Sequence, residues 1–455
     1  MSQISRNPWT REILAQVALT RETEIEQTIV KAQFAFKNWH KHFSLYERLE
    51  PVVKLAEILI SQRESLALLI TQEMGKRYTE SLAEIDKCAW LCDIYANQSM
   101  EWLEPEYIKT EARKSFVQPL PLGVILLVMP WNFPFWQVIR AAIPAIIAGN
   151  SVILKHASNV PQCAQALLSL FQQAGFKEGL FNVVFVNGAQ VASLIRHSHV
   201  RGISLTGSEP AGRSVAQLAA QEFKKVVLEL GGSDPFIVLE DANLKLALET
   251  AIQSRFSNSG QSCIAAKRFI IDKYHYNDFC VLLSERIQAL RIGDPMDPET
   301  DIAPLAKPEY SLELHHQVVS SLQTGANLAC GGSIWPEHEA CYQPTLLTNV
   351  TPGMNAFDEE TFGPVATISK ATDIQHAISL ANSSHYGLGS TVFTQDSTTA
   401  QTIAENLRTG CTTINGLMRS DPRLPFGGTG NSGVGREMGR LGLLEFTNLK
   451  TIIHS

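Results

Sequence analysis

A regular alternation of strand-like and helix-like segments constrains the fold of this chain more than any other feature. Short apolar runs predict strands, and longer segments with apolar residues at helical spacing predict helices. In chain order these are a strand at 151–154, a helix at 161–174, a strand at 183–186, a helix at 189–197, a strand at 202–205, a helix at 210–221 and a strand at 225–228. Such alternation predicts an α/β fold whose parallel sheet is doubly wound through right-handed crossovers.

The segments on either side extend this prediction to the whole chain. Helical spacing over 24–39, 49–72 and 78–103 predicts an α-helical start, followed by strands within 117–128 and a helix over 135–148 interrupted by Pro144. A second α/β series spans 235–414, with a helix at 244–257 and a strand at 267–271, and predicts a second sheet. The strand-like tail, 444–453, is able to pair with another subunit. A chain of 455 residues is too long for one ordinary core, which agrees with at least two domains.

Composition excludes several classes of protein. The chain has 45% hydrophobic and 18% charged residues, which is typical of a soluble globular protein. Its net charge of -7 argues against a nucleic-acid partner, which would need a basic face. The sequence contains no apolar run long enough for a membrane span, and its polar N-terminus has no signal-peptide core. We therefore expect a cytoplasmic protein without a membrane partner.

The cysteines give no sign of a metal or disulfide framework. Eight are scattered along the chain, and no pair has the C-x-x-C spacing of a zinc site or a dithiol redox motif. In a reducing compartment most of them are expected to be small buried hydrophobes, as Cys163 would be on its helical face. No metal ligand set is predicted.

One cysteine stands in a setting that favours chemistry over packing. Cys263 ends the turn-like sequence Gly-Gln-Ser-Cys, between the predicted helix 244–257 and the strand 267–271. A thiolate is the strongest common nucleophile among side chains near neutral pH. Upstream, Glu229 ends an apolar run and is followed by two glycines, and a glutamate held nearby could activate the water that releases a covalent intermediate. The pair therefore predicts a two-step acyl chemistry.

Several motifs follow one another in a recognisable order. They are PWNFP at 130–134, LTGS at 205–208, LELGG at 228–232, GQSC at 260–263, EETFGPV at 359–365 and PFGG at 425–428. With them the chain resembles the NAD(P)-dependent aldehyde dehydrogenase superfamily over essentially its whole length. Within that superfamily it is similar to the succinate-semialdehyde dehydrogenases, in the shorter branch that carries KHA at 155–157.

The resemblance implies an architecture as well as a reaction. It predicts a Rossmann-type cofactor-binding domain formed by 1–108 and 122–229, and an α/β catalytic domain over 230–430. A small β oligomerisation element is predicted from 109–121 and 431–455. The implied reaction is the NADP- or NAD-dependent oxidation of an aldehyde, and the implied assembly is a homodimer or homotetramer.

The resemblance assigns catalysis to Cys263, Asn132 and Glu229. The Cys263 thiolate would attack the aldehyde carbonyl, while the Asn132 side chain and the Cys263 backbone N–H donate to the oxyanion that develops. Hydride transfer would leave a thioester, which Glu229 would hydrolyse by activating water. Considered one at a time, Cys263 is also compatible with an inert thiol, Asn132 with a turn-forming residue and Glu229 with an acid at a solvated strand end. The surrounding motifs disfavour all three of these alternatives together.

A G-x-G-x-x-G pattern at Gly428, Gly430 and Gly433 follows a proline-containing loop rather than a strand, so we do not interpret it as a phosphate-binding loop. The resemblance instead points to residues just after predicted strands, where open α/β sheets bind ligands. Ser208 opens the helix 210–221, whose N-terminal N–H groups suit a pyrophosphate. Glu360 would accept from the nicotinamide ribose, although an exposed loop acid is the alternative. The full set of expected cofactor-binding residues is Trp131, Lys155, Ser158, Gly188, Ser208, Leu230, Glu360 and Phe362.

Position 158 bears on the choice of cofactor. Many NAD-preferring members of the superfamily carry a glutamate there, which holds the adenine ribose 2′-hydroxyl. This chain has Ser158, with Lys155 three positions earlier. A hydroxyl and an ammonium can bind a 2′-phosphate that a carboxylate would repel. NADP is therefore the expected cofactor, and NAD remains possible.

Substrate preference is expected to rest on Arg140 and Ser420. In the resembling enzymes an arginine and a serine at these positions meet the substrate carboxylate, which a guanidinium clamps in bidentate fashion. An arginine paired with an acid at an interface is the alternative. Ser257 occupies a position where longer relatives have a second arginine, so we expect weaker carboxylate binding or a contribution from Arg419 or Arg423. Relatives with a redox switch have a second cysteine where this chain has Ala265, so no active-site disulfide is expected.

Three other functions remain open from the sequence. The same enzyme could act on glutaric semialdehyde or on a broader range of aldehydes. A thiol hydrolase would need a histidine beside Cys263, and neither His197 nor His275 stands in a motif. A non-catalytic protein with this fold would not need the complete set of Cys263, Glu229 and Asn132.

Overall fold

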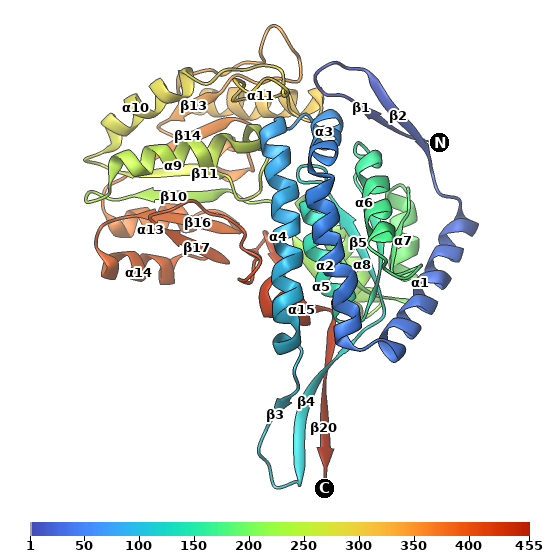
Figure 1. The fold of residues 1–455 in the computed structure, drawn as a ribbon. Helices are drawn as coiled ribbons and strands as arrows, with labels where there is room; N and C mark the ends of the chain where they lie inside the picture. The colour runs from blue at the N-terminus through green and yellow to red at the C-terminus, as the bar shows by residue number, and fades with distance from the viewer. Residues whose placement is uncertain (1) are drawn as a thin grey trace.

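The computed structural model describes residues 2–455, so Met1, the first residue of the predicted cofactor-binding domain, lies outside it. Two α/β sheets lie side by side, and a small three-stranded sheet projects from the body (Figure 1). This arrangement confirms the predicted α/β class with separate sheets. Among the described residues, no helix is long and apolar enough to cross a membrane.

The first large sheet has six strands in the order β19-β9-β8-β5-β6-β7. All neighbours in it run parallel except β19, which is antiparallel to β9. The chain passes from β5 outward to β7 and then returns to β8 on the other side of β5, so β5 and β8 form a topological switch point. The strands are β5 (Val124–Met129), β6 (Ser151–His156), β7 (Phe181–Val183), β8 (Val200–Thr206), β9 (Lys225–Glu229) and β19 (Gly433–Val434).

Side chains of this sheet alternate between two apolar layers, as the period of a strand requires. Ile125 and Leu127 pack among α2 to α6, whereas Val124 and Leu126 pack against α1, α7 and α8. The helices are α1 (Glu22–His42), α2 (Leu45–Ser61), α3 (Arg63–Met74), α4 (Tyr78–Trp102), α5 (Trp136–Ile147), α6 (Pro161–Gln173), α7 (Gly188–Arg196) and α8 (Glu209–Gln221).

A buried ion pair fixes the start of α5, the helix that carries Arg140. Glu84 on α4 accepts hydrogen bonds from the backbone N–H groups of Phe135 (2.9 Å) and Trp136 (3.0 Å), and so satisfies two donors at the helix N-terminus. Lys76 neutralises Glu84 at 2.5 Å. Contrary to the prediction, α5 continues through Pro144, because the helix is packed on all sides in the core.

The second large sheet has seven strands in the order β12-β13-β14-β11-β10-β16-β17, and only β12 is antiparallel to its neighbour. Helices α9 and α10 cover one face, and α11 to α14 cover the other. The strands are β10 (Asp234–Val238), β11 (Ala266–Asp272), β12 (Asn327–Cys330), β13 (Thr345–Thr348), β14 (Val365–Ala371), β16 (Gly389–Phe393) and β17 (Cys411–Ile414). The helices are α9 (Leu244–Phe256), α10 (Tyr276–Gln288), α11 (Pro308–Gln323), α12 (Asn355–Asp358), α13 (Ile374–Asn382) and α14 (Ser397–Asn406), and the 3₁₀ turn η1 (Ser257–Gly260) follows α9.

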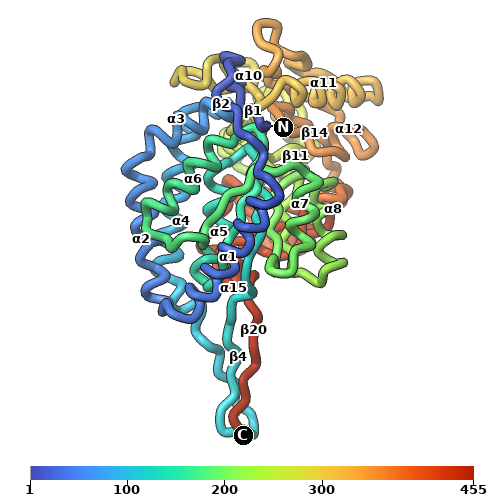
Figure 2. The backbone as a smooth tube through the Cα atoms, turned by 90° about the vertical axis from the view of Figure 1, so that its right-hand side faces the viewer, coloured from blue at the N-terminus to red at the C-terminus, as the bar shows by residue number. Residues whose placement is uncertain are grey.

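The three-stranded sheet consists of β3 (Glu106–Tyr107), β4 (Lys114–Pro121) and β20 (Thr447–His454). It extends away from the body, with the C-terminus near its tip (Figure 2). Strand β20 lies at one edge and carries the exposed apolar side chains of Leu449 and Ile453. The tail thus pairs with β4 of its own chain and leaves its other edge open.

Several local predictions need correction. A hairpin of β1 (Ser2–Arg6) and β2 (Ile13–Ala18) precedes α1, so the start is not wholly helical. The single helix predicted at 49–72 is two helices, because the chain turns at Gln62. The strand predicted at 183–186 is β7 at Phe181–Val183, and the tail predicted at 444–453 begins within α15 (Gly439–Glu445). Two-residue strands β15 (Tyr386–Gly387) and β18 (Thr429–Gly430) form a separate ladder.

The domain bounds remain a prediction, and two strands fall across them. β19 joins the six-stranded sheet although 431–455 was assigned to the oligomerisation element. β3 pairs with β4 although its residues were assigned to the cofactor-binding domain.

Candidate active site

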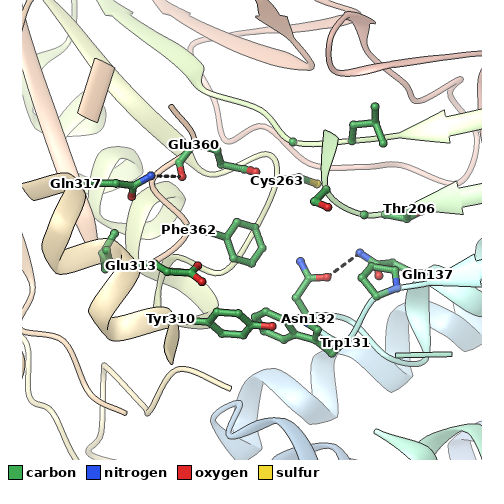
Figure 3. Close-up of a pocket in the computed structure, with 16 residues that line it drawn as sticks. Trp131, Asn132, Gln137, Thr206, Cys263, Tyr310, Glu313, Gln317, Glu360 and Phe362 are labelled. Atoms are coloured by element: carbon green, nitrogen blue, oxygen red, sulfur yellow. Dashed lines mark hydrogen bonds between the residues drawn. The ribbon is translucent and has the colours of Figure 1, made fainter. Parts of the chain in front are cut away.

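The candidate active site lies at the carboxyl ends of β5, β8 and β9, where they face the part of the chain that forms the seven-stranded sheet and its helices. A cavity opens there beside the switch point of the six-stranded sheet (Figure 3). One wall follows these strands, and the other comes from the Cys263 loop, α11 and the segment after α12. The lining residues are Pro130, Trp131, Asn132, Gln137, Thr206, Gly207, Ser208, Leu230, Gly231, Cys263, Tyr310, Glu313, Leu314, Gln317, Glu360 and Phe362.

A left-handed backbone presents Cys263. Asn258, Ser259 and Gly260 have φ values of 52°, 53° and 75°, so the chain reverses sharply between α9 and the cysteine. Glycine is required at 260, because a Cβ there would lie 2.3 Å from the carbonyl oxygen of Gly363. Ser259 holds the turn in place by donating to the carbonyl of Ala303 at 2.9 Å. The Gly-Gln-Ser sequence before Cys263 is thus a turn, as predicted.

A buried lysine, Lys267, holds the same loop through hydrogen bonds to its backbone. Lys267 Nζ donates to the backbone carbonyl oxygens of Ser262 (2.9 Å) and Cys263 (2.8 Å) and lies 3.4 Å from Glu360 Oε1. The other oxygen of Glu360 accepts no hydrogen bond within residues 2–455. No motif pointed to Lys267, because it stands in an apolar strand and its partners are backbone atoms.

Asn132 is held by hydrogen bonds at both ends of its amide. Its Oδ1 accepts from Gln137 Nε2 at 3.0 Å, and its Nδ2 donates to the carbonyl of Gln261 at 3.1 Å. One N–H of the amide remains for an oxyanion in the cavity. The backbone N–H of Cys263 likewise donates to no group in the described part of the chain. The two donors named from the sequence therefore lie at one cavity beside the thiol.

The protonation of Cys263 differs from the thiolate expected from the sequence. Burial raises the pKa of the Cys263 thiol to about 12, and Arg140 and Lys267 oppose this rise only in part. Without ligands the group is therefore a thiol at neutral pH. A base or a nearby positive charge has to shift this equilibrium before attack.

Glu229 lies near the thiol but does not line the cavity. It is 2% exposed, and neither carboxylate oxygen has a hydrogen-bond partner among residues 2–455. Burial, together with the neighbouring carboxylate of Glu437, raises the pKa of Glu229 well above its usual value, and Arg140 opposes the shift. To activate water beside the thioester, the side chain has to turn from this buried position toward the cavity.

The predicted cofactor-binding residues fall into two groups. Trp131, Ser208, Leu230, Glu360 and Phe362 line the cavity with Cys263. Lys155, Ser158 and Gly188 do not line it; they stand at the end of β6, in the following turn and at the start of α7. Burial lowers the pKa of Lys155. All three positions are at the same edge of the sheet as the cavity.

Two aromatic contacts and a buried guanidinium were not predicted. Tyr310 on α11 stacks on Trp131 with ring centroids 5.1 Å apart, and Phe362 meets the same indole edge-on at 5.8 Å. Arg255 at the end of α9 donates to the carbonyls of Val365 (2.6 Å) and Thr361 (2.7 Å), and so fixes the segment that carries Glu360 and Phe362. Tyr310 and Arg255 come from segments distant in sequence and stand in no local motif, whereas Phe362 belongs to the EETFGPV motif.

A second cavity reaches Cys263 and is lined by both residues predicted to bind substrate. Arg140 is 3% exposed, lies 2.6 Å from Glu437 and donates to Thr206 Oγ1 at 3.3 Å. Arg140 thus has the protein partner named as the alternative, while it also borders the cavity. Ser257 lines the same cavity, and Arg419 does too, whereas Arg423 does not line it and pairs with Asp421 at 2.6 Å. Lys87 and Trp136, which the sequence did not single out, also line it.

No histidine lines either cavity in the part of the chain from 2 to 455. His156 is enclosed in the core, with a ring nitrogen 2.9 Å from the carbonyl of Pro134. The arrangement therefore lacks the base that a cysteine hydrolase needs.

Comparison with known proteins gives a consistent result. The profile described as "Aldehyde dehydrogenase family" matches residues 2–452. The chain is 45% identical to the "Probable succinate-semialdehyde dehydrogenase [NADP(+)]" of Synechocystis sp., across 98% of each chain. It is 42% identical to "Succinate semialdehyde dehydrogenase [NAD(P)+] Sad" of Escherichia coli, across 99% of this chain and 97% of that one.

Among solved structures, succinic semialdehyde dehydrogenase from Streptococcus pyogenes in complex with NADP+ has a TM-score of 0.97 and 36% identity, with 99% of each chain covered. The match extends over both large sheets and the projecting three-stranded sheet. The chain therefore belongs to the aldehyde dehydrogenase family.

Proposed function

We propose that the protein oxidises succinic semialdehyde to succinate with NADP, or less efficiently with NAD. The observation that carries this proposal is the position of Cys263 between two cavities of different character. One is lined by five of the eight residues expected to hold a dinucleotide, and the other is lined by the cationic side chains of Lys87, Arg140 and Arg419, which suit a carboxylate. The printed names of the relatives from Synechocystis and Escherichia coli support the same substrate.

The first cavity and the neighbouring strand ends offer donors and acceptors suited to a dinucleotide. Helix α8 begins beside it, and the hydroxyl of Ser208 makes no capping bond, so hydroxyl and N–H groups are available to a pyrophosphate. A Cβ at Gly188 would meet no atom within 4 Å, which leaves open space at the start of α7. Glu360 keeps one oxygen free for a ribose hydroxyl. Lys155 and Ser158 would hold a 2′-phosphate, since neither repels it.

The chain's own groups would divide the chemistry as follows. The Cys263 thiol would release its proton to solvent and its sulfur would form the bond to the aldehyde carbon, while Asn132 Nδ2 and the Cys263 N–H stabilise the oxyanion. The bound cofactor supplies the hydride acceptor and a positive ring. Glu229, after its side chain turns toward the cavity, would take a proton from the water that hydrolyses the thioester. Glutaric semialdehyde or a wider aldehyde range remains the alternative substrate.

A panel of aldehydes tests this proposal directly. NADPH formation is followed with succinic semialdehyde, glutaric semialdehyde and butanal, the last of which replaces the carboxylate by a methyl group. The proposal expects the highest kcat/KM for succinic semialdehyde and a higher value with NADP than with NAD. Equal rates for succinic semialdehyde and butanal would exclude a carboxylate-specific enzyme.

We also propose a homodimer or homotetramer joined through the projecting sheet. Its support is the open edge of β20, whose exposed apolar side chains suit strand pairing with another copy. Sedimentation of the chain with and without residues 447–454 would test the assembly.

All eight cysteines are free, which suits a reducing compartment such as the cytoplasm.

A further inference from the structure

The second cavity contains a cation that the proposed chemistry leaves unused. Lys87 projects from α4, with its Nζ 2.6 Å from Ser420 Oγ and 4.2 Å from the ring centroid of Trp136. Cys263, Arg140 and Ser420 line the same cavity. The ammonium therefore shares a cavity with the thiol and borders a hydroxyl predicted to meet the substrate.

The surroundings of Lys87 provide no counter-ion. Within residues 2–455 it forms no salt bridge, although its neighbours are paired. Lys76 is matched by Glu84, Arg140 by Glu437 and Arg423 by Asp421. A half-buried ammonium without a carboxylate loses solvation that the hydroxyl of Ser420 and the ring of Trp136 do not fully replace. Lys87 is thus a cation that lacks an ion-pair partner.

The hydrogen bond between Lys87 and Ser420 leaves donors on both side chains available to an anion. A lysine has only donors, so Ser420 Oγ is the acceptor, and its own O–H is left to donate elsewhere. Two further N–H groups of Lys87 are free as well. A carboxylate between them would accept from both side chains, which are the donors it prefers.

We propose that Lys87, together with the hydroxyl of Ser420, binds the distal carboxylate of the semialdehyde. This inference rests on the proposed function and names the residue that provides its selectivity. Arg140, neutralised by Glu437, then borders the site and contributes less charge than its type suggests. Lys87 takes the place of the second arginine that Ser257 does not supply.

The proposal predicts that binding of the substrate carboxylate depends on pH. Burial, reinforced by the nearby Arg140, lowers the pKa of Lys87 to about 8; Arg419 adds to this effect, and Cys88 and Glu84 oppose it. A bound carboxylate stabilises the ammonium. Binding is therefore strong below this pKa and weakens as the pH rises through it. Of the other acids that line this cavity, Asp421 is held by Arg423 and Glu80 pairs with Arg77.

The test compares two uncharged variants and one rescue variant on two substrates. Lys87→Met should raise the KM for succinic semialdehyde about 10- to 100-fold, the effect of losing a charge-assisted hydrogen bond. Its kcat/KM for butanal should change little. Lys87→Arg should recover part of the loss. Lys54→Met, which makes the same substitution at an exposed lysine of α2 outside both cavities, should leave the KM for succinic semialdehyde nearly unchanged.

The wild-type KM for succinic semialdehyde should also rise between pH 7 and 9, roughly as a group of pKa about 8 loses its proton, and Lys87→Met should lose that dependence. Equal losses on both substrates in Lys87→Met, or an equal rise of the KM in Lys54→Met, would overturn the proposal.

Succinate binding separates this inference from the proposed function. If the wild type does not distinguish succinic semialdehyde from butanal, the proposed function fails, and titration calorimetry with succinate then decides on Lys87. Binding that Lys87→Met loses and Lys87→Arg retains would support a carboxylate site. Absent binding, or binding unchanged in Lys87→Met, would overturn it.

Discussion

The ammonium of Lys267 donates a hydrogen bond to the carbonyl oxygen of Cys263, the residue whose thiol faces the cavity, across 2.8 Å. The same ammonium lies 3.4 Å from Glu360, which belongs to the same wall of the cavity. One buried cation thus sets the backbone of the proposed nucleophile and the position of a proposed cofactor ligand. This link makes the two halves of the site dependent on each other.

Lys267→Met should weaken both halves together. The carbonyls of Ser262 and Cys263 would lose a buried donor, which typically costs about 1–3 kcal/mol. We expect a lower melting temperature, a lower kcat and a higher KM for NADP. Glu360→Gln serves as the control: it should raise the KM for NADP with a smaller effect on stability. A normal kcat in Lys267→Met would show that the Cys263 loop holds its shape without this lysine.

Glu229→Gln should slow the second half of the reaction more than the first. The amide cannot take a proton from water, so thioester hydrolysis becomes limiting. Rapid mixing with NADP and succinic semialdehyde should show a burst of NADPH and then a much slower steady rate. If the burst itself disappears, Glu229 acts chiefly in forming the thiolate.

Ser158→Glu should shift cofactor preference from NADP toward NAD. The carboxylate adds an acceptor for a free 2′-hydroxyl and repels a 2′-phosphate, which is worth roughly a few kcal/mol at close range. Ser158→Gln has a similar size without the charge and should shift the ratio less. An unchanged ratio of kcat/KM for the two cofactors in Ser158→Glu would mean that position 158 does not face the ribose.

Alkylation of Cys263 in the absence of cofactor should be slow and should accelerate with pH. Burial raises the pKa of this thiol to about 12, and only the thiolate reacts. The rate with iodoacetamide, followed by mass spectrometry of the Cys263 peptide, should rise about tenfold per pH unit from pH 7 to 9. A plateau near pH 8 would contradict a thiol pKa this high.

The sequence predicted the site best where a short motif determines a backbone shape. The Gly-Gln-Ser turn before Cys263 and the PWNFP segment carrying Asn132 have local signals, and both residues lie at the same cavity. Alternating strands and helices likewise predicted the α/β sheets. The break at Gln62 has no glycine or proline to mark it, so α2 and α3 looked like one helix.

Side chains whose role depends on distant partners could not be predicted in this way. Arg255 and Tyr310 contact residues far along the chain, and Lys267 joins the nearby carbonyls of Ser262 and Cys263 to the distant Glu360. None of the three stands in a local motif. Glu229 was located correctly at a strand end. Its burial and its raised pKa depend on the fold, because only the folded chain brings Glu437 and Arg140 near it.

The central claim is that Cys263 carries the acyl group between the two steps, and one measurement tests it most directly. Glu229→Gln is mixed with NADP and succinic semialdehyde, quenched in acid during the burst, digested and mapped by mass spectrometry. The account predicts a succinyl group on the Cys263 peptide in an amount equal to the NADPH of the burst. NADPH formed without that adduct, or the adduct on another cysteine, would contradict it.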